Sequence, residues 1–255
     1  MGLVEALTEY LPVSSTGHLI LTSHLLGIEQ SDFHAAFEIV IQGGSILAVI
    51  WHYRKLLLSH LSELFSGSAK GRDFFLKLFV AFCPAAIVGL LFHKQVKAYL
   101  FGPIPVVIAL VVGGIIMIAL ERRLKHSAGS DEEITIKGAF FVGVAQIFSL
   151  WPGTSRSMTT LLGGRFMGLS PYKAAEFSFL LAIPIILAAT GYELLKVDVS
   201  ALSENLDLLL VGTGVSFVAS LFVIRIFLGF LKKHSLEVFG WYRIVAGLLY
   251  YFFIK

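Results

Sequence analysis

The 255-residue sequence is 56% hydrophobic and 15% charged, with a formal net charge of +3 and a mean hydropathy of +0.83. Soluble domains carry roughly a quarter charged residues, so this composition excludes an ordinary soluble domain. The single cysteine, Cys83, excludes an intramolecular disulfide. We expect the lipid bilayer, and no nucleic acid, as the surroundings of this chain.

Long apolar runs indicate how the chain crosses the bilayer. A hydrocarbon core about 30 Å thick requires roughly 20 helical residues, and a helix satisfies its own backbone polar groups. Runs of this length occupy residues 33–51, 74–92, 103–120, 171–190, 206–231 and 236–254. The sequence therefore predicts an all-α integral membrane protein with about six transmembrane helices.

Two shorter apolar segments, residues 4–18 and 144–157, resemble each other. In each, an apolar helix meets a proline and a hydroxyl-rich loop, and a short apolar segment then ends at a glycine. Such internal similarity is typical of transporter-like folds built from repeats around broken helices. We expect one membrane domain, residues 1–255, with repeat halves at about 1–120 and about 135–255.

Basic residues concentrate in alternate connections, which the positive-inside rule places in the cytoplasm. This placement works only if both broken segments return to the side from which they enter. The prediction is two re-entrant helical hairpins, one from each side, in an inverted-topology internal repeat. The basic set is Arg54, Lys55, Lys70, Arg72, Arg122, Arg123, Lys125, Lys232 and Lys233.

The first broken segment carries two carboxylates and a hydroxyl-rich loop. Glu5 and Glu9 are four residues apart and share one helix face. Intramembrane carboxylates usually face a polar cavity, although an interfacial helix would place them in water. Ser14, Ser15 and Thr16 suit helix N-caps, and the free N–H groups at a helix start also suit phosphate.

His18 lies three residues beyond Ser15, one helical turn away and within reach of its hydroxyl. A hydroxyl beside a base that a carboxylate orients has the arrangement of an activated nucleophile. The spacing alone supports this interpretation and simple helix capping about equally.

The second broken segment adds an arginine to the hydroxyl groups of Thr154, Ser155 and Ser157. The planar fork of Arg156 matches phosphate oxygens and stays charged. An interfacial arginine is the alternative, but the repeat alignment places Arg156 opposite Thr16, near the midplane. The combined inventory suits phosphoryl transfer on an anionic substrate with an apolar tail.

Four sequence stretches carry a family resemblance: EALTEYLPVSSTGH at 5–18, PGTSRS at 152–157, FEIVIQ at 37–42 and AEFSFLLA at 175–182. They are similar to the signatures of the bacterial undecaprenyl-diphosphate phosphatase family of the bacitracin-resistance type. The resemblance implies hydrolysis of undecaprenyl diphosphate to undecaprenyl phosphate and inorganic phosphate. It implies recycling of this lipid carrier for peptidoglycan synthesis, and bacitracin resistance.

The resemblance also implies roles for particular residues. Ser15 would be the nucleophile, with Glu9, His18 and Arg156 as essential partners and Glu5 in support. The implied phosphate ligands are Ser14, Thr16, Thr154, Ser155 and Ser157.

The family pattern also implies a cellular location and a response to metal ions. It implies a bacterial plasma (inner) membrane location, with the active site opening to the periplasmic face. It also implies a response to a divalent cation, Mg or Ca, although the sequence has no compact metal-ligand motif and the metal ligands are unknown. The family usually has around ten more apolar residues before the first signature, so this chain is expected to be N-terminally short or to start at a late methionine.

A transporter or flippase of polyprenyl phosphate is the rival function, since inverted repeats around a midplane site also serve alternating access. The grouping of Ser15, His18 and Glu9 distinguishes the two, because a carrier needs no nucleophile and base. A homodimer is a further expectation. It rests on glycine-bearing helix faces that permit pairing, at Gly113, Gly114, Gly212 and Gly214.

Overall fold

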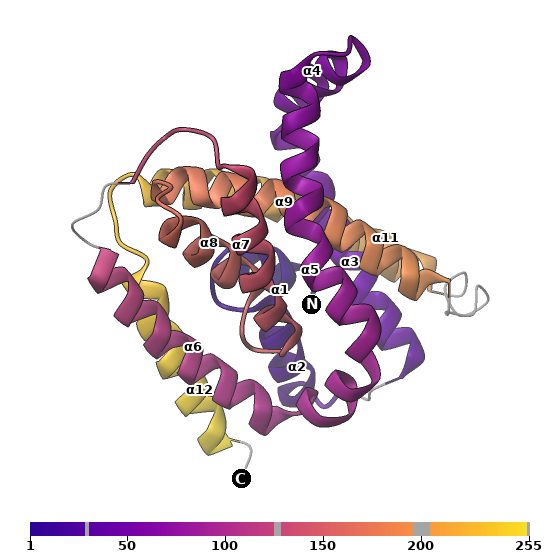
Figure 1. Cartoon of the computed structure of the whole chain (residues 1–255). Helices are drawn as coiled ribbons and strands as arrows, with labels where there is room; N and C mark the ends of the chain where they lie inside the picture. Colours follow the sequence, from indigo (N-terminus) through magenta and orange to yellow (C-terminus); the bar gives the residue numbers. More distant parts are fainter. Residues whose placement is uncertain (29–30, 125–128, 196–204, 254–255) are drawn as a thin grey trace.

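The computed structural model describes residues 1–28, 31–124, 129–195 and 205–253, and within these ranges it is helical, with no strand (Figure 1). Five helices are long and apolar enough to cross a membrane. The chain is therefore a multi-pass, all-α membrane protein. The five are α3 (Asp32–His52), α5 (Ala69–Leu100), α6 (Pro103–Leu124), α9 (Pro171–Leu194) and α11 (Leu206–Leu231).

The sixth expected span corresponds to α12 (Glu237–Phe253), a helix with 17 described residues. It packs along the length of α6. This contact is close because Gly114 and Gly240 face each other: a Cβ on Gly114 would lie 2.6 Å from the Gly240 carbonyl oxygen. At about 1.5 Å per residue, α12 is slightly shorter than the hydrocarbon core.

Two pairs of short helices form the broken hairpins expected from the sequence. The first pair is α1 (Gly2–Glu9) and α2 (Ser15–Leu25). The second is α7 (Ile136–Gln146), extended by the 3-10 turn η1 (Ile147–Leu150), and α8 (Arg156–Phe166). An 11-residue helix such as α2 or α8 is only about 17 Å long. Neither can span a core about 30 Å thick, so each hairpin turns within it.

The remaining helix, α4 (Arg54–Phe65), packs against α5. Together α4 and the first turns of α5 project from one end of the bundle (Figure 1). Arg54 and Lys55 lie in the first turn of α4, and Lys70 and Arg72 lie in the first turn of α5. This projection therefore holds a large part of the basic set that the sequence places in the cytoplasm.

Equivalent helices of the two predicted halves pack in matching ways. Helix α1 contacts α11 and α7 contacts α5, while α3 meets α9. Both hairpins approach their neighbours through a glycine. A Cβ would lie 2.4 Å from the Gly212 carbonyl oxygen if added to Gly2, and 2.5 Å from the Ala81 carbonyl oxygen if added to Gly143. This packing supports the two-half organisation, whose boundaries stay a prediction.

The glycines that suggested a homodimer serve mainly to pack helices of the same chain. Gly113 and Gly114 lie against α12, and Gly212 lies against α1 and α3. Only Gly214 of these four has no atom within 4 Å of an added Cβ. The homodimer therefore stays a prediction, because most of the glycine-bearing faces from which it was inferred pack against helices of the same chain.

Candidate active site

Both hairpin turns end in the same backbone conformation. Ser14 and Ser155 have φ values of 76° and 77° and are the non-glycine residues with positive φ in the described chain. Each serine caps the following helix: the Ser14 hydroxyl accepts a hydrogen bond from the Gly17 N–H, and the Ser155 hydroxyl from the Met158 N–H, both at 3.2 Å. The caps offset part of the cost of this backbone conformation.

This correspondence corrects the repeat alignment by one residue. The second turn has two residues between Pro152 and its N-cap serine, whereas the first has one between Pro12 and Ser14. Arg156 therefore corresponds to Ser15, as the first residue of its helix, and not to Thr16 as the sequence alone predicted. The turns thus place a hydroxyl and a guanidinium at matching positions.

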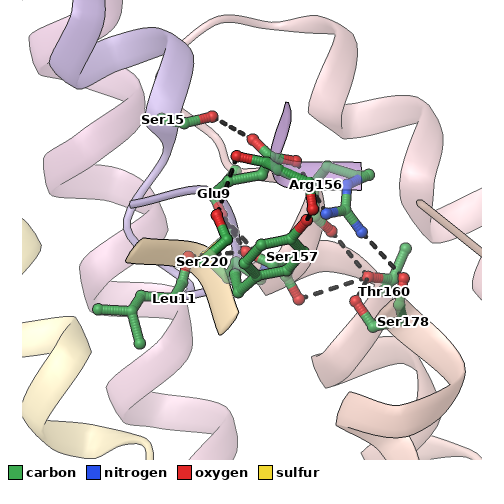
Figure 2. A network of polar contacts seen from close by, with 12 residues as sticks. Glu9, Leu11, Ser15, Arg156, Ser157, Thr160, Ser178 and Ser220 are labelled. Carbon is green, nitrogen blue, oxygen red and sulfur yellow. Dashed lines mark hydrogen bonds and ion pairs between the residues drawn. The ribbon is translucent and has the colours of Figure 1, made fainter. Parts of the chain in front are cut away.

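Glu9 joins these two residues (Figure 2). The Ser15 hydroxyl donates a hydrogen bond to Glu9 Oε2, and Arg156 Nη2 donates to Glu9 Oε1 at 2.9 Å. Arg156 Nη1 donates to the backbone carbonyl of Ser178 in α9, also at 2.9 Å. The Glu9 and Arg156 side chains are 9% and 11% exposed. Because few water molecules reach this ion pair, its charges are weakly screened.

A cavity of about 420 Å³ opens onto this network. Its polar wall comes from both hairpins, and α3 adds Gln42. Its apolar wall includes Val96, Phe101, Ile185 and Ile186. A cavity with a charged, hydroxyl-lined end and an apolar end suits an amphiphile with an anionic head group. The hairpin residues that line it are Glu9, Ser14, Ser15, Thr16, Ser155 and Arg156, with Ser149, Leu150, Pro152 and Gly153.

Four of the predicted site residues lie off this cavity: Ser157, Thr154, Glu5 and His18. Ser157, 1% exposed, donates to the Leu11 carbonyl at 2.8 Å and ties the two turns together. Thr154 lines a separate apolar groove beside α6 and α8. Glu5 is fully buried one turn behind Glu9, and neither of its carboxyl oxygens has a hydrogen-bond partner among the described residues. Ser157 and Thr154 therefore do not line the cavity as expected for phosphate ligands.

His18 does not contact Ser15. Its Nδ1 lies 2.8 Å from the Ser14 carbonyl oxygen, and its Nε2 lies 2.8 Å from the Tyr242 hydroxyl. The His18 and Tyr242 rings are stacked with centroids 5.7 Å apart. In the structure the imidazole therefore does not bind the Ser15 hydroxyl as the spacing suggested, because the Ser14 carbonyl and Tyr242 of α12 occupy both of its ring nitrogens.

Sequence reasoning missed the partners that other helices supply. Gln42 and Ser178 lie within the resembling stretches 37–42 and 175–182 but were given no role there, and Tyr242 lies outside all four stretches. Glu38 and Glu176 lie off the cavity as well, in pairs with His34 at 3.1 Å and Lys173 at 2.7 Å. In the described part of the chain, no group of three or more His, Cys, Asp or Glu side chains is placed to bind a metal.

Comparison with known proteins adds to this geometry. A family described as bacitracin resistance protein BacA matches residues 1–249. The chain is 49% identical to the undecaprenyl-diphosphatase of Sorangium cellulosum strain So ce56, over 98% of this chain and 83% of that protein. It is 46% identical to the undecaprenyl-diphosphatase of Caldanaerobacter subterraneus subsp. tengcongensis, over 100% of this chain and 94% of that protein. It is 44% identical to the undecaprenyl-diphosphatase of Acinetobacter baumannii strain AYE, over 98% of this chain and 92% of that protein.

Proposed function

Because the chain belongs to the family of the bacitracin resistance protein BacA, we propose that it hydrolyses undecaprenyl diphosphate to undecaprenyl phosphate and inorganic phosphate. This reaction recycles the lipid carrier for peptidoglycan synthesis and is the basis of bacitracin resistance. The observation that carries the proposal is the network in which Glu9 binds both the Ser15 hydroxyl and the Arg156 guanidinium. A nucleophile, a base and a cation from two hairpins meet in one cavity.

The proposed reaction begins when Ser15 Oγ attacks the terminal phosphorus and Glu9 accepts the hydroxyl proton. The new O–P bond forms as the bond from that phosphorus to the bridging oxygen breaks, and undecaprenyl phosphate leaves. The proton on Glu9 passes to the departing phosphate, which leaves Glu9 ionised again. Water then attacks the phosphoserine as Glu9 accepts a proton from it, the Oγ–P bond breaks, Glu9 returns the proton to Ser15 Oγ, and inorganic phosphate is released. A direct attack by water with Glu9 as base is the variant without a covalent intermediate.

Arg156 supplies the positive charge that phosphoryl transfer requires. Its two terminal nitrogens bind the Ser178 carbonyl and Glu9, and its buried Nε has no hydrogen-bond partner among the described residues. Its guanidinium lines the cavity beside the Ser155 N-cap. The N–H groups at the starts of α2 and α8 add to the positive potential there.

A divalent cation would bind at this site only together with the substrate, whose phosphates would supply further ligands. Protein sites for Mg²⁺ often use one or two carboxylates together with substrate phosphates. Glu9 lines the cavity, whereas Glu5 is buried behind it. Glu9 would hold the cation together with the substrate phosphates, and the cation when bound would neutralise charge on the diphosphate.

We further propose that the cavity opens to the periplasmic face of the plasma (inner) membrane. Val96 and Phe101, which line the cavity, lie at the C-terminal end of α5. Lys70 and Arg72 lie at its opposite end. The positive-inside rule assigns that basic end to the cytoplasm, so the cavity lies toward the outer face.

The test is phosphate release from undecaprenyl diphosphate by the purified protein in detergent, with and without Mg²⁺ or Ca²⁺. Ser15→Ala and Arg156→Ala are each expected to lower the turnover number by at least about 10²-fold, the usual loss when a general acid–base or charge-stabilising group is removed. Ser23→Ala is the matched control. It removes another buried hydroxyl of α2, which binds His34 and lies off the cavity, and should leave turnover within about twofold.

The rival function makes a different prediction in the same assay. A transporter of polyprenyl phosphate would bind the lipid and release no phosphate under any cation condition. The hydrogen bond from Ser15 to Glu9 favours the hydrolase, because a carrier needs cationic ligands but no paired nucleophile and base. Full turnover by Ser15→Ala would leave only the variant in which water attacks directly.

A further inference from the structure

Arg243 of α12 is a buried arginine that the proposed chemistry does not use. Its side chain is 0% exposed, and no carboxylate among the described residues pairs with it. Burying an uncompensated charge is costly, and proteins retain such a group only when its hydrogen bonds are fully used. The partners of this guanidinium therefore indicate why the residue is there.

Among the described residues, the guanidinium of Arg243 donates to four backbone carbonyl oxygens. Nη1 donates to Pro12 at 3.1 Å, in the first hairpin turn, and Nη2 donates to Gly153 at 2.8 Å, in the second. Nη2 also donates to Ala109 at 3.0 Å, and Nε donates to Leu110 at 3.4 Å, both in α6. One planar fork thus joins both turns to the α6–α12 pair.

The two turn carbonyls occupy matching positions. Pro12 lies three residues before Ser15, the first residue of α2, and Gly153 lies three residues before Arg156, the first residue of α8. Arg243 therefore holds the same point of each turn, three residues before the proposed nucleophile Ser15 in one turn and three residues before the proposed phosphate-binding Arg156 in the other. A displacement at either carbonyl would be passed along a few bonds to those side chains.

Neighbouring glycines make room for this contact. A Cβ on Gly113 would lie 2.2 Å from Arg243 Nη2. Gly153 has φ +94°, and a Cβ there would lie 2.6 Å from the Val106 carbonyl oxygen. An apolar side chain in place of Arg243 could fill the same volume, but it would leave the carbonyls of Pro12 and Gly153 without this donor.

We propose that Arg243 is a positioning residue that holds the two re-entrant turns in register, so that Ser15 and Arg156 meet at one phosphate group. It acts through the backbone and does not contact the substrate cavity. The part of this inference that concerns turnover rests on the proposed phosphatase function, whereas the part that concerns the turns does not.

The first test is independent of activity and uses hydrogen exchange measured by mass spectrometry on the full-length protein in detergent. Arg243→Lys keeps the charge but loses the fork, and it is expected to raise exchange about tenfold in peptides covering residues 10–16 and 151–157. The matched control is Arg122→Lys on the same helix pair, where Arg122 binds Glu237 at 2.5 Å. The control should leave both turns unchanged. Faster exchange in one turn only, or in neither, overturns the proposal.

The second test is a double-mutant cycle on phosphate release. Arg243→Lys alone is expected to lower the turnover number about 10²-fold and to leave KM within about twofold of the parent. The reason is that misplaced Ser15 and Arg156 side chains lose mainly their interactions with the transition state. Arg156→Ala should then cost less than about tenfold in the Arg243→Lys background, since its contribution is already lost. If the double variant instead loses the product of the two single losses in turnover number, the two residues act independently and the proposal is overturned.

Gly113→Ala provides a second variant that keeps the arginine but displaces it, since the added Cβ would overlap Nη2. It should reproduce both results, and it replaces Arg243→Lys if that protein does not fold. A parent protein that releases no phosphate would defeat the proposed function. The exchange measurement would still decide the role of Arg243.

Discussion

At the residue scale, Glu9 is the point where the two hairpins meet. One carboxyl oxygen accepts from Ser15 and the other from Arg156 at 2.9 Å. The proposed nucleophile and the proposed phosphate-binding cation are thus coupled through one carboxylate, and a proton that leaves Ser15 would have an acceptor already in contact. His18 is directed elsewhere, toward the Ser14 carbonyl and Tyr242. The structure therefore favours Glu9 over His18 as the base.

This geometry ranks two variants. Glu9→Gln keeps the shape of the side chain but removes the base, and it should lower the turnover number by about 10²- to 10⁴-fold. His18→Ala should cost less than about tenfold, because the imidazole reaches Ser15 only indirectly, through the Ser14 backbone. Initial rates of phosphate release at saturating substrate measure both.

Glu176→Gln is the control for the first variant, since Glu176 pairs with Lys173 at 2.7 Å and lies off the cavity. Its turnover should stay within about twofold of the parent. Equal losses in Glu9→Gln and His18→Ala would contradict the ranking. They would mean that His18 leaves Tyr242 and joins Ser15 once substrate is bound.

At the element scale, each hairpin depends on one serine that both strains and caps its turn. Ser14 and Ser155 have positive φ, where a Cβ is unfavourable, while their hydroxyls accept from the N–H groups of Gly17 and Met158. A glycine would remove the strain and lose the cap. An alanine would lose the cap and keep the strain.

We therefore expect the glycine variant at each position to be more stable than the alanine variant by about 1 kcal/mol. Thermal unfolding in detergent, followed by circular dichroism, compares Ser14→Gly with Ser14→Ala and repeats the pair at Ser155. Ser66 is the control, since it ends α4 with φ −78°. There the alanine variant should be at least as stable as the glycine variant. The same order at all three positions would refute the account of the turns.

At the scale of the whole molecule, the basic end of α5 and the cavity end of α5 should lie on opposite sides of the membrane. In a Cys83→Ala background, one cysteine is placed at Ser66, after α4, or at Gly102, between α5 and α6. A membrane-impermeant maleimide added to intact cells should label Gly102→Cys, and should label Ser66→Cys only after permeabilisation. The reverse pattern would place the cavity opening in the cytoplasm.

Much of the architecture follows from the sequence because its causes are local. The length of an apolar run is set by the thickness of the bilayer, and the run 206–231 coincides with helix α11. Proline followed by hydroxyl residues predicts where a helix breaks and restarts, and α2 begins at Ser15 within such a motif. The sequence alone therefore determined the helical class, the broken hairpins and the membership of Glu9, Ser15 and Arg156 in one site.

Tertiary structure decided which of these residues touch. Glu9 and Arg156 are 147 positions apart, and His18 and Tyr242 are 224 apart. No local pattern encodes a contact at that separation. The partner of a side chain depends on how helices from both halves pack, and a hydroxyl takes whichever acceptor that packing brings within about 3 Å. For this reason Glu9 meets Arg156, His18 meets Tyr242, and Arg243 meets two turns from which it is remote in the chain.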